Sequence, residues 1–578
     1  VGIPTIAGQV AFHPKYTGNP LVNVGCIGIV KKDLMIHSHA GDIGDIYILA
    51  GGKTGRDGIH GVTFASRDLD AGSEDDIGAV QLGDPITKEP LMHLCLELNE
   101  LGLLTGMKDL GGGGLSCVVG ELALDAGFGA KVNLEKVHLK QKNMAPWEIW
   151  VSESQERMMF TVKPEEVQTV LDRCDAWDVE AVAIGEVIKE KRNIVRFKGI
   201  EILNLDLEFT TGGPVYNRPY NLPEIDNLEA VELPDLPANL SQTIKDIISN
   251  PEVSSKDWVI RQYDHEVRGA TAIKPIQGKI GKEVHGDSSV LKPVENSWKG
   301  LALTADVNPY LMEANPYHGT MSAVEEICRN LASVGARIDS LADCLCFGNP
   351  QRPDIMGQFK SSCDALRDAA TSVDVPYVSG NVSLYNETAE GAIPPTPVLM
   401  GIGLVNDIRK CVTSDLKEEG SIWLVGENKE QMGASLYYRT MGIECPNVPT
   451  TDFESFIPRM EQLIDAIECG EVVACHDIST GGIALSVIEM CMSGVGAKIK
   501  LSGNMRADLE LFNESNGRWI VQVKPGLEEK FSKRFDYAKE IGTVNDKINF
   551  ALNDNEKLEF SIEELRKLWT EPLWNRLA

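Results

Sequence analysis

The sequence repeats itself. Short blocks with the same spacing of Gly, Asp and apolar residues occur twice, in the same order, along the chain. Because several such matches in one order do not arise by chance, the pattern indicates a tandem duplication. The matched blocks are 2–11 with 374–383, 108–115 with 476–483, 153–157 with 514–518, and 183–187 with 540–544.

Each copy holds two units, which predicts a layout of A, B, A′ and B′. In the second copy, well over a hundred residues precede Pro376, whereas in the first copy only three residues precede the matching Pro4. We therefore expect only the end of unit A in this sequence. The predicted domains are 1–31 (end of unit A), 32–212 (unit B), 213–255 (a Pro-rich linker), 256–408 (unit A′) and 409–578 (unit B′).

Composition excludes several classes of protein. The 578 residues are 43% hydrophobic and 24% charged, which is typical of globular domains and not of bulk disorder. No run of about 18 apolar residues occurs, so no membrane-spanning segment is expected. The net charge of −30 argues against nucleic acid as a partner, because phosphates repel an acidic surface. The 13 Cys lack CxxC spacing, which predicts free thiols in a reducing cytoplasm.

The chain contains patterns of both helices and strands, which predicts a mixed α/β fold. Apolar residues at helical spacing predict buried helices over 91–101 and 324–334. Apolar runs rich in β-branched residues predict strands over 21–30 and 520–523. Within the linker, one helical face is formed by Leu240, Ile244, Ile247 and Ile248.

Two polar motifs in the first copy are candidates for a binding site. Asp109 precedes a run of four glycines, an arrangement in which a carboxylate can hold Mg²⁺ and backbone amides can take phosphate oxygens. A helix N-cap followed by a flexible turn is the alternative interpretation. Glu153, Ser154 and Gln155 place a carboxylate, a hydroxyl and an amide side by side, and can either grip a polar ligand or form a polar loop.

Two further motifs lie in the second copy. Asp343 and the segment 380–386 place Asp, Asn and Ser next to Gly, directly after apolar strand-like residues. Asp and Asn supply the oxygen ligands that Mg²⁺ prefers, although ordinary turns use the same residues. The sequence contains no HExxH motif, no GxSxG motif and no Cys/His cluster of zinc-site spacing, which argues against hydrolases and zinc enzymes of those classes.

Taken together, the motifs resemble those of phosphoribosylformylglycinamidine synthase, and more narrowly its small, separate synthetase subunit. The resemblance extends over essentially the whole chain. It implies a tandem duplication of the aminoimidazole ribonucleotide synthetase-like A–B unit, with the A domains forming a central pseudo-twofold sheet or barrel flanked by the B domains. The motifs that carry it are 80–85, 109–114, 153–158, 261–265, 343–350 and 380–387.

The resemblance also implies a reaction. Members of this family use ATP and ammonia to convert formylglycinamide ribonucleotide into formylglycinamidine ribonucleotide in de novo purine synthesis, with Mg²⁺. Carried over by motif, Asp109 and Asn381 would bind Mg²⁺, and Asp343 and Gly380 would contact ATP. The implied substrate contacts are Gln81, Glu153, Ser154, Gln155 and Ser383.

In this family the catalytic His and further ligands lie in the first A unit, so we expect them upstream of Val1. The missing segment would then come from another chain or from a longer gene product. Ammonia would come from a glutaminase subunit, with a small bridging subunit completing the complex. Two alternatives remain open: a non-catalytic scaffold or nucleotide-binding paralogue, and another ATP-using synthetase of the same superfamily.

Overall fold

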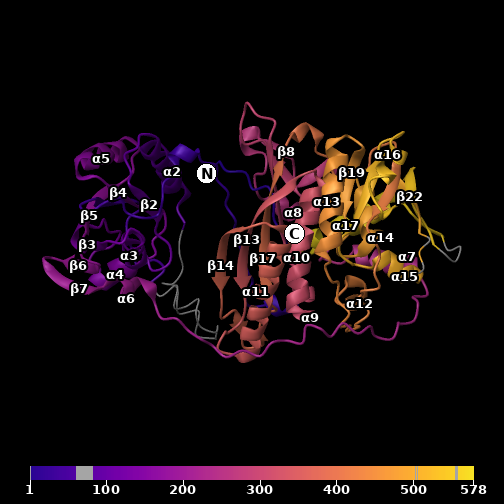
Figure 1. Cartoon of the computed structure of the whole chain (residues 1–578), viewed down its shortest axis with the longest axis horizontal. Coiled ribbons are helices and arrows are strands. Elements are labelled where there is room, and N and C mark those ends of the chain that lie inside the picture. The colour runs from indigo at the N-terminus through magenta and orange to yellow at the C-terminus, as the bar shows by residue number, and fades with distance from the viewer. Residues whose placement is uncertain (1, 60–82, 502, 504, 553–556, 578) are drawn as a thin grey trace. The chain divides into compact units, whose positions relative to one another are not determined.

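The computed structural model describes residues 2–59, 83–501, 503, 505–552 and 557–577. The chain divides into two compact units (Figure 1). Unit 1 comprises residues 26–217, and unit 2 comprises residues 2–25 together with 218–578. The N-terminal segment is tied to unit 2, because the amide of Thr5 donates to the carbonyl oxygen of Asp264 (2.8 Å) and the Ser289 hydroxyl donates to the carbonyl oxygen of Ile6 (2.5 Å).

Unit 1 is built on a seven-stranded sheet with the order β2-β4-β1-β5-β3-β6-β7. Its strands are β1 (Ile46–Gly51), β2 (Gly106–Asp109), β3 (Gly129–Asn133), β4 (Arg157–Val162), β5 (Ala181–Ile188), β6 (Arg192–Phe197) and β7 (Ile200–Asp206). Its helices are α2 (Pro85–Glu100), α3 (Leu115–Asp125), α4 (Pro146–Val151), α5 (Val167–Ala176) and α6 (Leu207–Gly212).

Helices cover both faces of this sheet, which explains why the central strand β1 is apolar at successive positions. Tyr47 and Leu49 pack in one cluster with the apolar face of α3. Ile48 and Ala50 point the other way, into a cluster with α2 and α5. The predicted helix over 91–101 is therefore confirmed as part of α2, with Leu91, Leu94 and Leu98 buried, although Leu101 lies past its end and is exposed.

The first part of unit 2 is a six-stranded sheet with the order β14-β13-β17-β12-β11-β8. Its strands are β8 (Thr271–Ile273), β11 (Ser289–Leu291), β12 (Gly300–Asp306), β13 (Arg337–Cys346), β14 (Tyr377–Ser383) and β17 (Thr396–Val405), and two small ribbons are formed by β9 (Ile276–Lys279) with β10 (Lys282–His285) and β15 (Glu387–Thr388) with β16 (Gly391–Ala392). The helices are α8 (Asp257–Ile260), α9 (Pro309–Ala314), α10 (Pro316–Ser333) and α11 (Pro353–Val373).

The second part of unit 2 repeats the sheet of unit 1. Its strand order, β19-β21-β18-β22-β20-β23-β24, matches that of the first sheet strand for strand, which agrees with the tandem duplication inferred from the sequence. The strands are β18 (Ser421–Val425), β19 (Val472–Asp477), β20 (Gly496–Lys500), β21 (Trp519–Val523), β22 (Ala538–Asn545), β23 (Ile548–Ala551) and β24 (Lys557–Phe560). The helices are α7 (Leu240–Ile248), α12 (Leu436–Thr440), α13 (Phe453–Glu468), α14 (Gly482–Cys491), α15 (Ala507–Phe512), α16 (Glu528–Ser532) and α17 (Ile562–Leu577).

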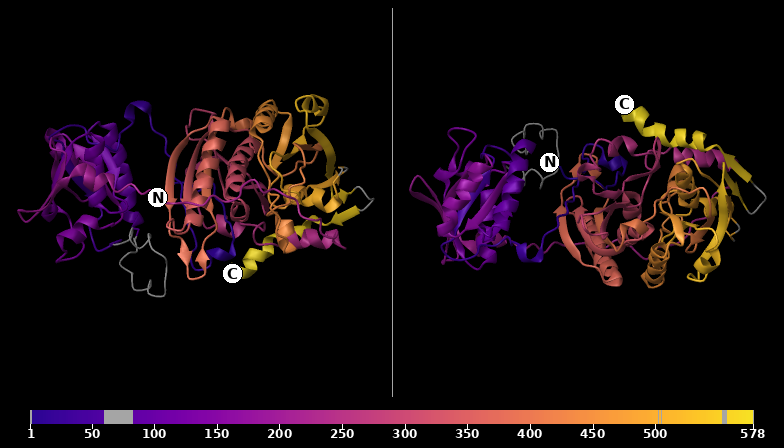
Figure 2. Two further views of the ribbon diagram at one scale, coloured as in Figure 1. Left: turned by 60° about the horizontal axis from the view of Figure 1, so that its bottom comes forward. Right: turned by 90° about the horizontal axis from the view of Figure 1, so that it is seen from above.

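The two sheets of unit 2 share a continuous core. One cluster joins α10 and α11, which lie side by side along the sheet in Figure 1, to α13 and to strands β18 and β21. A second cluster holds α7, α14 and α17 together. Figure 2 shows α7 in magenta beside the yellow C-terminal helix α17. All four apolar residues of the helical face predicted at 240–248 are buried there, so α7 is a core element. The predicted helix over 324–334 is part of α10, which ends one residue earlier at Ser333, and the predicted strand over 520–523 lies in β21.

One predicted element is wrong. Residues 21–30 form no strand, although they are apolar and β-branched. Val22 and Val24 are 88% and 89% exposed, so the segment lacks the neighbouring strand that a β-ladder requires.

All 13 cysteines are free, in agreement with the absence of disulfide-type spacing. Among the described residues, no helix is both long and apolar enough to cross a membrane.

Candidate functional site

The motif 153–157 forms a rigid turn between α4 and β4. Arg157 is 2% exposed and closes this turn from inside. Its Nε donates to the carbonyl oxygen of Ser154 (2.7 Å), and its Nη2 donates to that of Ser152 (2.6 Å). Because a buried guanidinium must find several acceptors, these bonds fix the backbone that carries the predicted ligands.

Glu153 links this turn to the glycine run. Its Oε1 accepts a hydrogen bond from the amide of Gly113 (2.9 Å), and the residue is 3% exposed. The next glycine, Gly114, has φ of 54°, and a Cβ there would overlap the carbonyl oxygen of Ser152. The glycines therefore allow close backbone approach, but the approaching partner is the chain's own turn, and the expected approach of a ligand stays a prediction. Asp109 lies at the end of β2 and is exposed.

The Ser154 hydroxyl is used inside the fold. It is fully buried, accepts from the amide of Gly55 (2.8 Å) and donates to the Asp57 carboxylate. Burial raises the pKa of Asp57, but the hydrogen bonds from Lys140 and Ser154 lower it more, and the net shift is downward. The Gln155 amide donates to the carbonyl oxygen of Glu153 (2.8 Å). The substrate contacts expected for these side chains stay predictions, and Gln81 lies outside the described residues.

The second copy contains the same turn. Arg518 is fully buried and donates through Nε to the carbonyl oxygen of Ser515 (2.8 Å) and through Nη2 to that of Asn513 (2.7 Å). Glu514 Oε1 accepts from the amide of Gly481 (2.8 Å), as Glu153 does from Gly113. The two copies therefore share the structure of this turn as well as its sequence pattern.

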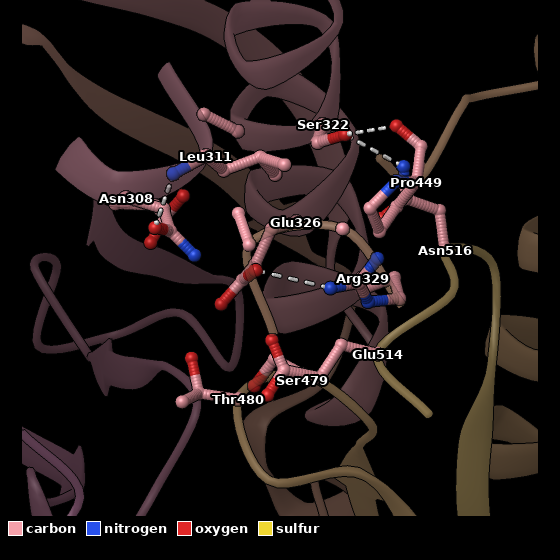
Figure 3. Close-up of a pocket in the computed structure, with 14 residues that line it drawn as sticks. Asn308, Leu311, Ser322, Glu326, Arg329, Pro449, Ser479, Thr480, Glu514 and Asn516 are labelled. Carbon is pink, nitrogen blue, oxygen red and sulfur yellow. Dashed lines mark hydrogen bonds and ion pairs between the residues drawn. The ribbon is translucent and has the colours of Figure 1, made fainter. Parts of the chain in front are cut away.

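A polar pocket lies beside this second turn, within unit 2 (Figure 3). Carboxylates, hydroxyls and amides dominate its lining, which suits a polar ligand better than an apolar one. The residues that line it are Asp306, Asn308, Leu311, Ser322, Ala323, Glu326, Arg329, Gly433, Ala434, Pro449, Ser479, Thr480, Glu514 and Asn516.

Arg329 neutralises the acidic wall of this pocket. It is 1% exposed and pairs with Glu325, with Glu326 (3.1 Å) and with Asp477 (3.3 Å); one of the dashed lines in Figure 3 joins Arg329 to Glu326. Asp477 matches Asp109 in the repeat, so the two copies differ: Asp109 is exposed, whereas its counterpart is buried in an ion pair. Burial raises the pKa of Asp306 to about 7, and its Oδ2 has no hydrogen-bond partner among the described residues.

Behind this wall, three residues of the described chain are close enough to share a metal ion: Asp287, His476 and Asp477. Both ring nitrogens of His476 are already engaged, Nδ1 with Asp287 (2.6 Å) and Nε2 with Glu489 (3.1 Å). Burial lowers the pKa of His476, but these two carboxylates raise it more, to well above its ordinary value. The imidazolium itself therefore balances the carboxylates, and the group is explained as an ion-pair network.

The motifs of the second copy lie at the carboxyl ends of two parallel strands, β13 and β14. Their register pairs Asp343 with Gly380 and places Asn381 and Ser383 further along the same edge. Because successive side chains of a strand alternate, Asp343 lies on one face of the sheet while Asn381 and Ser383 share the other. The expected ATP contact and the expected Mg²⁺ ligand of this edge therefore do not share a face.

Asp343 lies on the face covered by α11. Burial, and in a smaller part the charge of Asp343, raises the pKa of Cys363 on that helix to about 11. Burial also raises the pKa of Asp343 itself. On the opposite face, the Asn381 amide donates to the Cys344 sulfur (3.3 Å), and the Asn386 amide donates to the Ser383 hydroxyl (3.2 Å).

Sequence reasoning missed the pocket residues contributed by β12 and α10. Asp306 ends the apolar strand β12, and Asn308 lies between this strand and Pro309. The same strand-end pattern singled out the other motifs, so these two residues could have been found in that way. Arg329 could not have been predicted as a pocket residue, because its partner Asp477 lies far away in the sequence.

Family models match most of the chain. The C-terminal domain of AIR synthase related proteins matches residues 42–198 and 417–554, and the N-terminal domain of the same proteins matches residues 285–405. Each match covers most of one of the three large sheets, and the edge strands β7, β8 and β24 lie outside the matched residues.

A relative from Thermoplasma volcanium, phosphoribosylformylglycinamidine synthase subunit PurL, is 39% identical over 99% of this chain and 76% of its own length. Two solved Thermotoga maritima structures are similar in fold. PurL complexed with FGAR is 26% identical, with a TM-score of 0.66, and the match covers 89% of this chain and 74% of that chain. PurLQS is 25% identical, with a TM-score of 0.71, and the match covers 94% of this chain and 78% of that chain. Sequence, family models and fold agree, and the chain belongs to the family of phosphoribosylformylglycinamidine synthase subunit PurL.

Proposed function

We propose that this chain is the synthetase subunit that converts formylglycinamide ribonucleotide, ATP and ammonia into formylglycinamidine ribonucleotide, ADP and phosphate, a step of de novo purine synthesis. The observation that carries this proposal is 39% identity to a named synthase subunit over 99% of the chain. A solved relative that binds FGAR and is 26% identical supports the choice of substrate.

The amide oxygen of the substrate is a poor leaving group and must be activated before ammonia can replace it. ATP phosphorylates the amide oxygen of the substrate, ammonia attacks the resulting imidate carbon, and phosphate departs. The contribution of the protein is to hold the reactants in line and to provide fixed polar groups where charge develops. Turns closed from inside by a buried arginine, as at Arg157 and Arg518, are suited to this because their backbone needs no rearrangement during the reaction.

Individual roles follow the family motifs. Asp109 and Asn381 would hold Mg²⁺, which when bound neutralises charge on the ATP phosphates; their carboxylate and amide oxygens are donors of the type that this ion prefers, and both residues are exposed. Asp343 and Gly380 would contact ATP. The proposed substrate contacts are Gln81, Glu153, Ser154, Gln155 and Ser383.

The proposed roles of Asn381 and Ser383 are supported because both side chains lie on the same face of the β13–β14 pair. Glu153 and Gln155 are supported by the preorganised turn that carries them, although Glu153 already holds the amide of Gly113. Ser154 has the weakest support, because its hydroxyl is occupied by Gly55 and Asp57.

The ammonia would be delivered by partners. We propose that a glutaminase subunit and a small bridging subunit form a complex with this chain. A solved relative determined as PurLQS, with a TM-score of 0.71, supports a multi-subunit assembly.

Release of ADP tests the proposal. The chain is incubated with ATP, Mg²⁺ and ammonium, with or without formylglycinamide ribonucleotide, and in a parallel arm with the part of a relative that this chain does not cover. ADP release that depends on the ribonucleotide is expected in at least one arm. Its absence from both arms would contradict the proposal.

A further inference from the structure

Two thiols on β13 face each other across a single intervening residue. Cys344 and Cys346 are two positions apart on an extended strand, so their side chains leave the same face of the sheet. Their sulfurs lie 3.8 Å apart. Cys346 is 1% exposed, whereas Cys344 is partly exposed and offers access from solvent.

This spacing does not suit a disulfide. Two residues of a strand are separated by about 6.6 Å, and side chains that leave one face run nearly parallel, so the Cβ atoms are separated by a similar distance. A disulfide requires Cβ atoms about 3.8 Å apart. Cys344 and Cys346 could therefore be joined directly only if the strand moved, and β13 is held on both sides by β14 and β17.

The same spacing suits a bridging ion. A tetrahedral ion with metal–sulfur bonds of about 2.3 Å places its two sulfurs about 3.8 Å apart, which is the distance observed here. A third donor is in place, because Oδ1 of Asn23 lies 2.9 Å from the sulfur of Cys344 and 3.7 Å from that of Cys346. No backbone movement is required.

We propose that Cys344 and Cys346 form a two-thiolate binding site for a thiophilic divalent cation of the zinc–cadmium class. On binding, each thiol gives its proton to the buffer and each sulfur forms one bond to the ion, so one ion replaces two protons. Thiolates select ions of this class over Mg²⁺, which prefers oxygen. The sequence lacks the spacing of a four-ligand zinc site, and the remaining positions around the ion are left to Asn23 and water.

The position of the site has a consequence for activity, and this part rests on the proposed function. Asn381 contacts the Cys344 sulfur, and Ser383 pairs in register with Cys346. An ion held by the two sulfurs would therefore occupy the face on which the proposed Mg²⁺ ligand and substrate contact lie. We expect such an ion to inhibit the synthetase.

Binding is tested first and without turnover. The reduced full chain is titrated with Cd²⁺, and the ultraviolet charge-transfer band of the cadmium–thiolate bond is followed. The wild-type chain should bind one ion more tightly than C344S and C346S do, by about tenfold or more. The matched control C469S, which removes an exposed single cysteine, should bind as tightly as the wild type.

Circular dichroism of each variant confirms that it is folded. If the buried C346S does not fold, the partly exposed C344S carries the comparison alone. Wild-type affinity in a folded C344S or C346S would overturn the two-thiolate site.

Inhibition is tested second. Cd²⁺ should inhibit ribonucleotide-dependent ADP release by the wild type at concentrations that leave C344S active. Equal inhibition of both proteins would overturn the inhibitory role. Failure of the proposed function is distinguishable, because activity would then be absent before any Cd²⁺ is added.

Discussion

At the scale of single residues, the charge balance of the unit 2 pocket depends on one guanidinium. Arg329 is 1% exposed and meets three carboxylates, from Glu325, Glu326 and Asp477. A buried charge that loses its partner cannot be resolvated, so it costs far more free energy than a surface charge does.

Replacing Arg329 by Met should therefore lower the free energy of unfolding of unit 2 by about 3–5 kcal/mol. Arg337 provides a matched control, because it also meets three carboxylates, from Glu461, Asp465 and Glu468, but its side chain is 33% exposed. R337M should cost about 1 kcal/mol or less. Urea unfolding monitored by tryptophan fluorescence compares the two variants, and equal losses would contradict the assignment of Arg329 as a buried neutralising charge.

Glu514 should make stability depend on pH. Burial raises the pKa of Glu514 from 4.5 to about 7. Because the folded state then binds more protons than the unfolded state, this group contributes stability that is fully present below about 4.5 and is lost as the pH rises toward about 7. Gln cannot titrate, so E514Q should gain about 1–3 kcal/mol relative to the wild type between pH 5 and 8.

Urea midpoints measured at several pH values test this expectation. E514Q keeps an oxygen for the amide of Gly481, so its turn should remain intact. A stability difference that does not change with pH would show that Glu514 is ionised in the folded protein throughout this range.

Some candidate site residues could be predicted from the sequence because they stand in short local motifs. Asp109, Glu153 and Gly113 stand in short motifs whose spacing repeats in the second copy. The engagement of the Ser154 hydroxyl was not predictable, because its partners Gly55 and Asp57 lie about a hundred residues earlier in the chain.

At the scale of elements, the matching helices α3 and α14 of the two copies both have a glycine with positive φ at their N-terminal end. Gly114 before α3 and Gly482 at the start of α14 have φ of 54° and 66°, and a Cβ at either position would meet backbone oxygens of the neighbouring turn. A side chain there is penalised both by the positive φ and by the lack of space.

G114A should therefore destabilise unit 1 by about 1–3 kcal/mol or more. The control is G111A in the same glycine run, where a Cβ would meet only an oxygen of Asp109 at 3.8 Å, an ordinary contact. Thermal unfolding should separate the two variants clearly. If G111A were as damaging as G114A, the run would matter for general flexibility and not for one close approach.

Helices were predicted better than strands, for a physical reason. A helix carries its hydrogen-bond partners within itself, so the apolar spacing of α2, α7 and α10 was sufficient. A strand needs a neighbour. Residues 21–30 have the composition of a strand and are largely exposed without one, whereas 520–523 lie between β18 and β19 and form β21.

At the scale of the whole molecule, the tandem duplication inferred from the sequence is visible in the fold. Two sheets with identical strand order, in units 1 and 2, carry the same buried-arginine turn at Arg157 and Arg518. The two copies differ at one matched carboxylate: Asp109 is exposed, whereas Asp477 is buried and paired with Arg329. The exposure of Asp109 is compatible with its proposed role as a Mg²⁺ ligand, a role that Asp477 could not share without leaving its ion pair. The domain bounds read from the sequence stay a prediction.

Transfer of nitrogen is the most direct test of the synthetase function. The chain, with the part of a relative that it does not cover supplied in one arm, is given ATP, Mg²⁺, formylglycinamide ribonucleotide and ¹⁵N-ammonium, and the products are analysed by mass spectrometry. We predict a formylglycinamidine ribonucleotide that carries a single ¹⁵N atom for each ADP formed. ADP formed without incorporation of ¹⁵N, or no ribonucleotide-dependent ADP in either arm, would contradict the account.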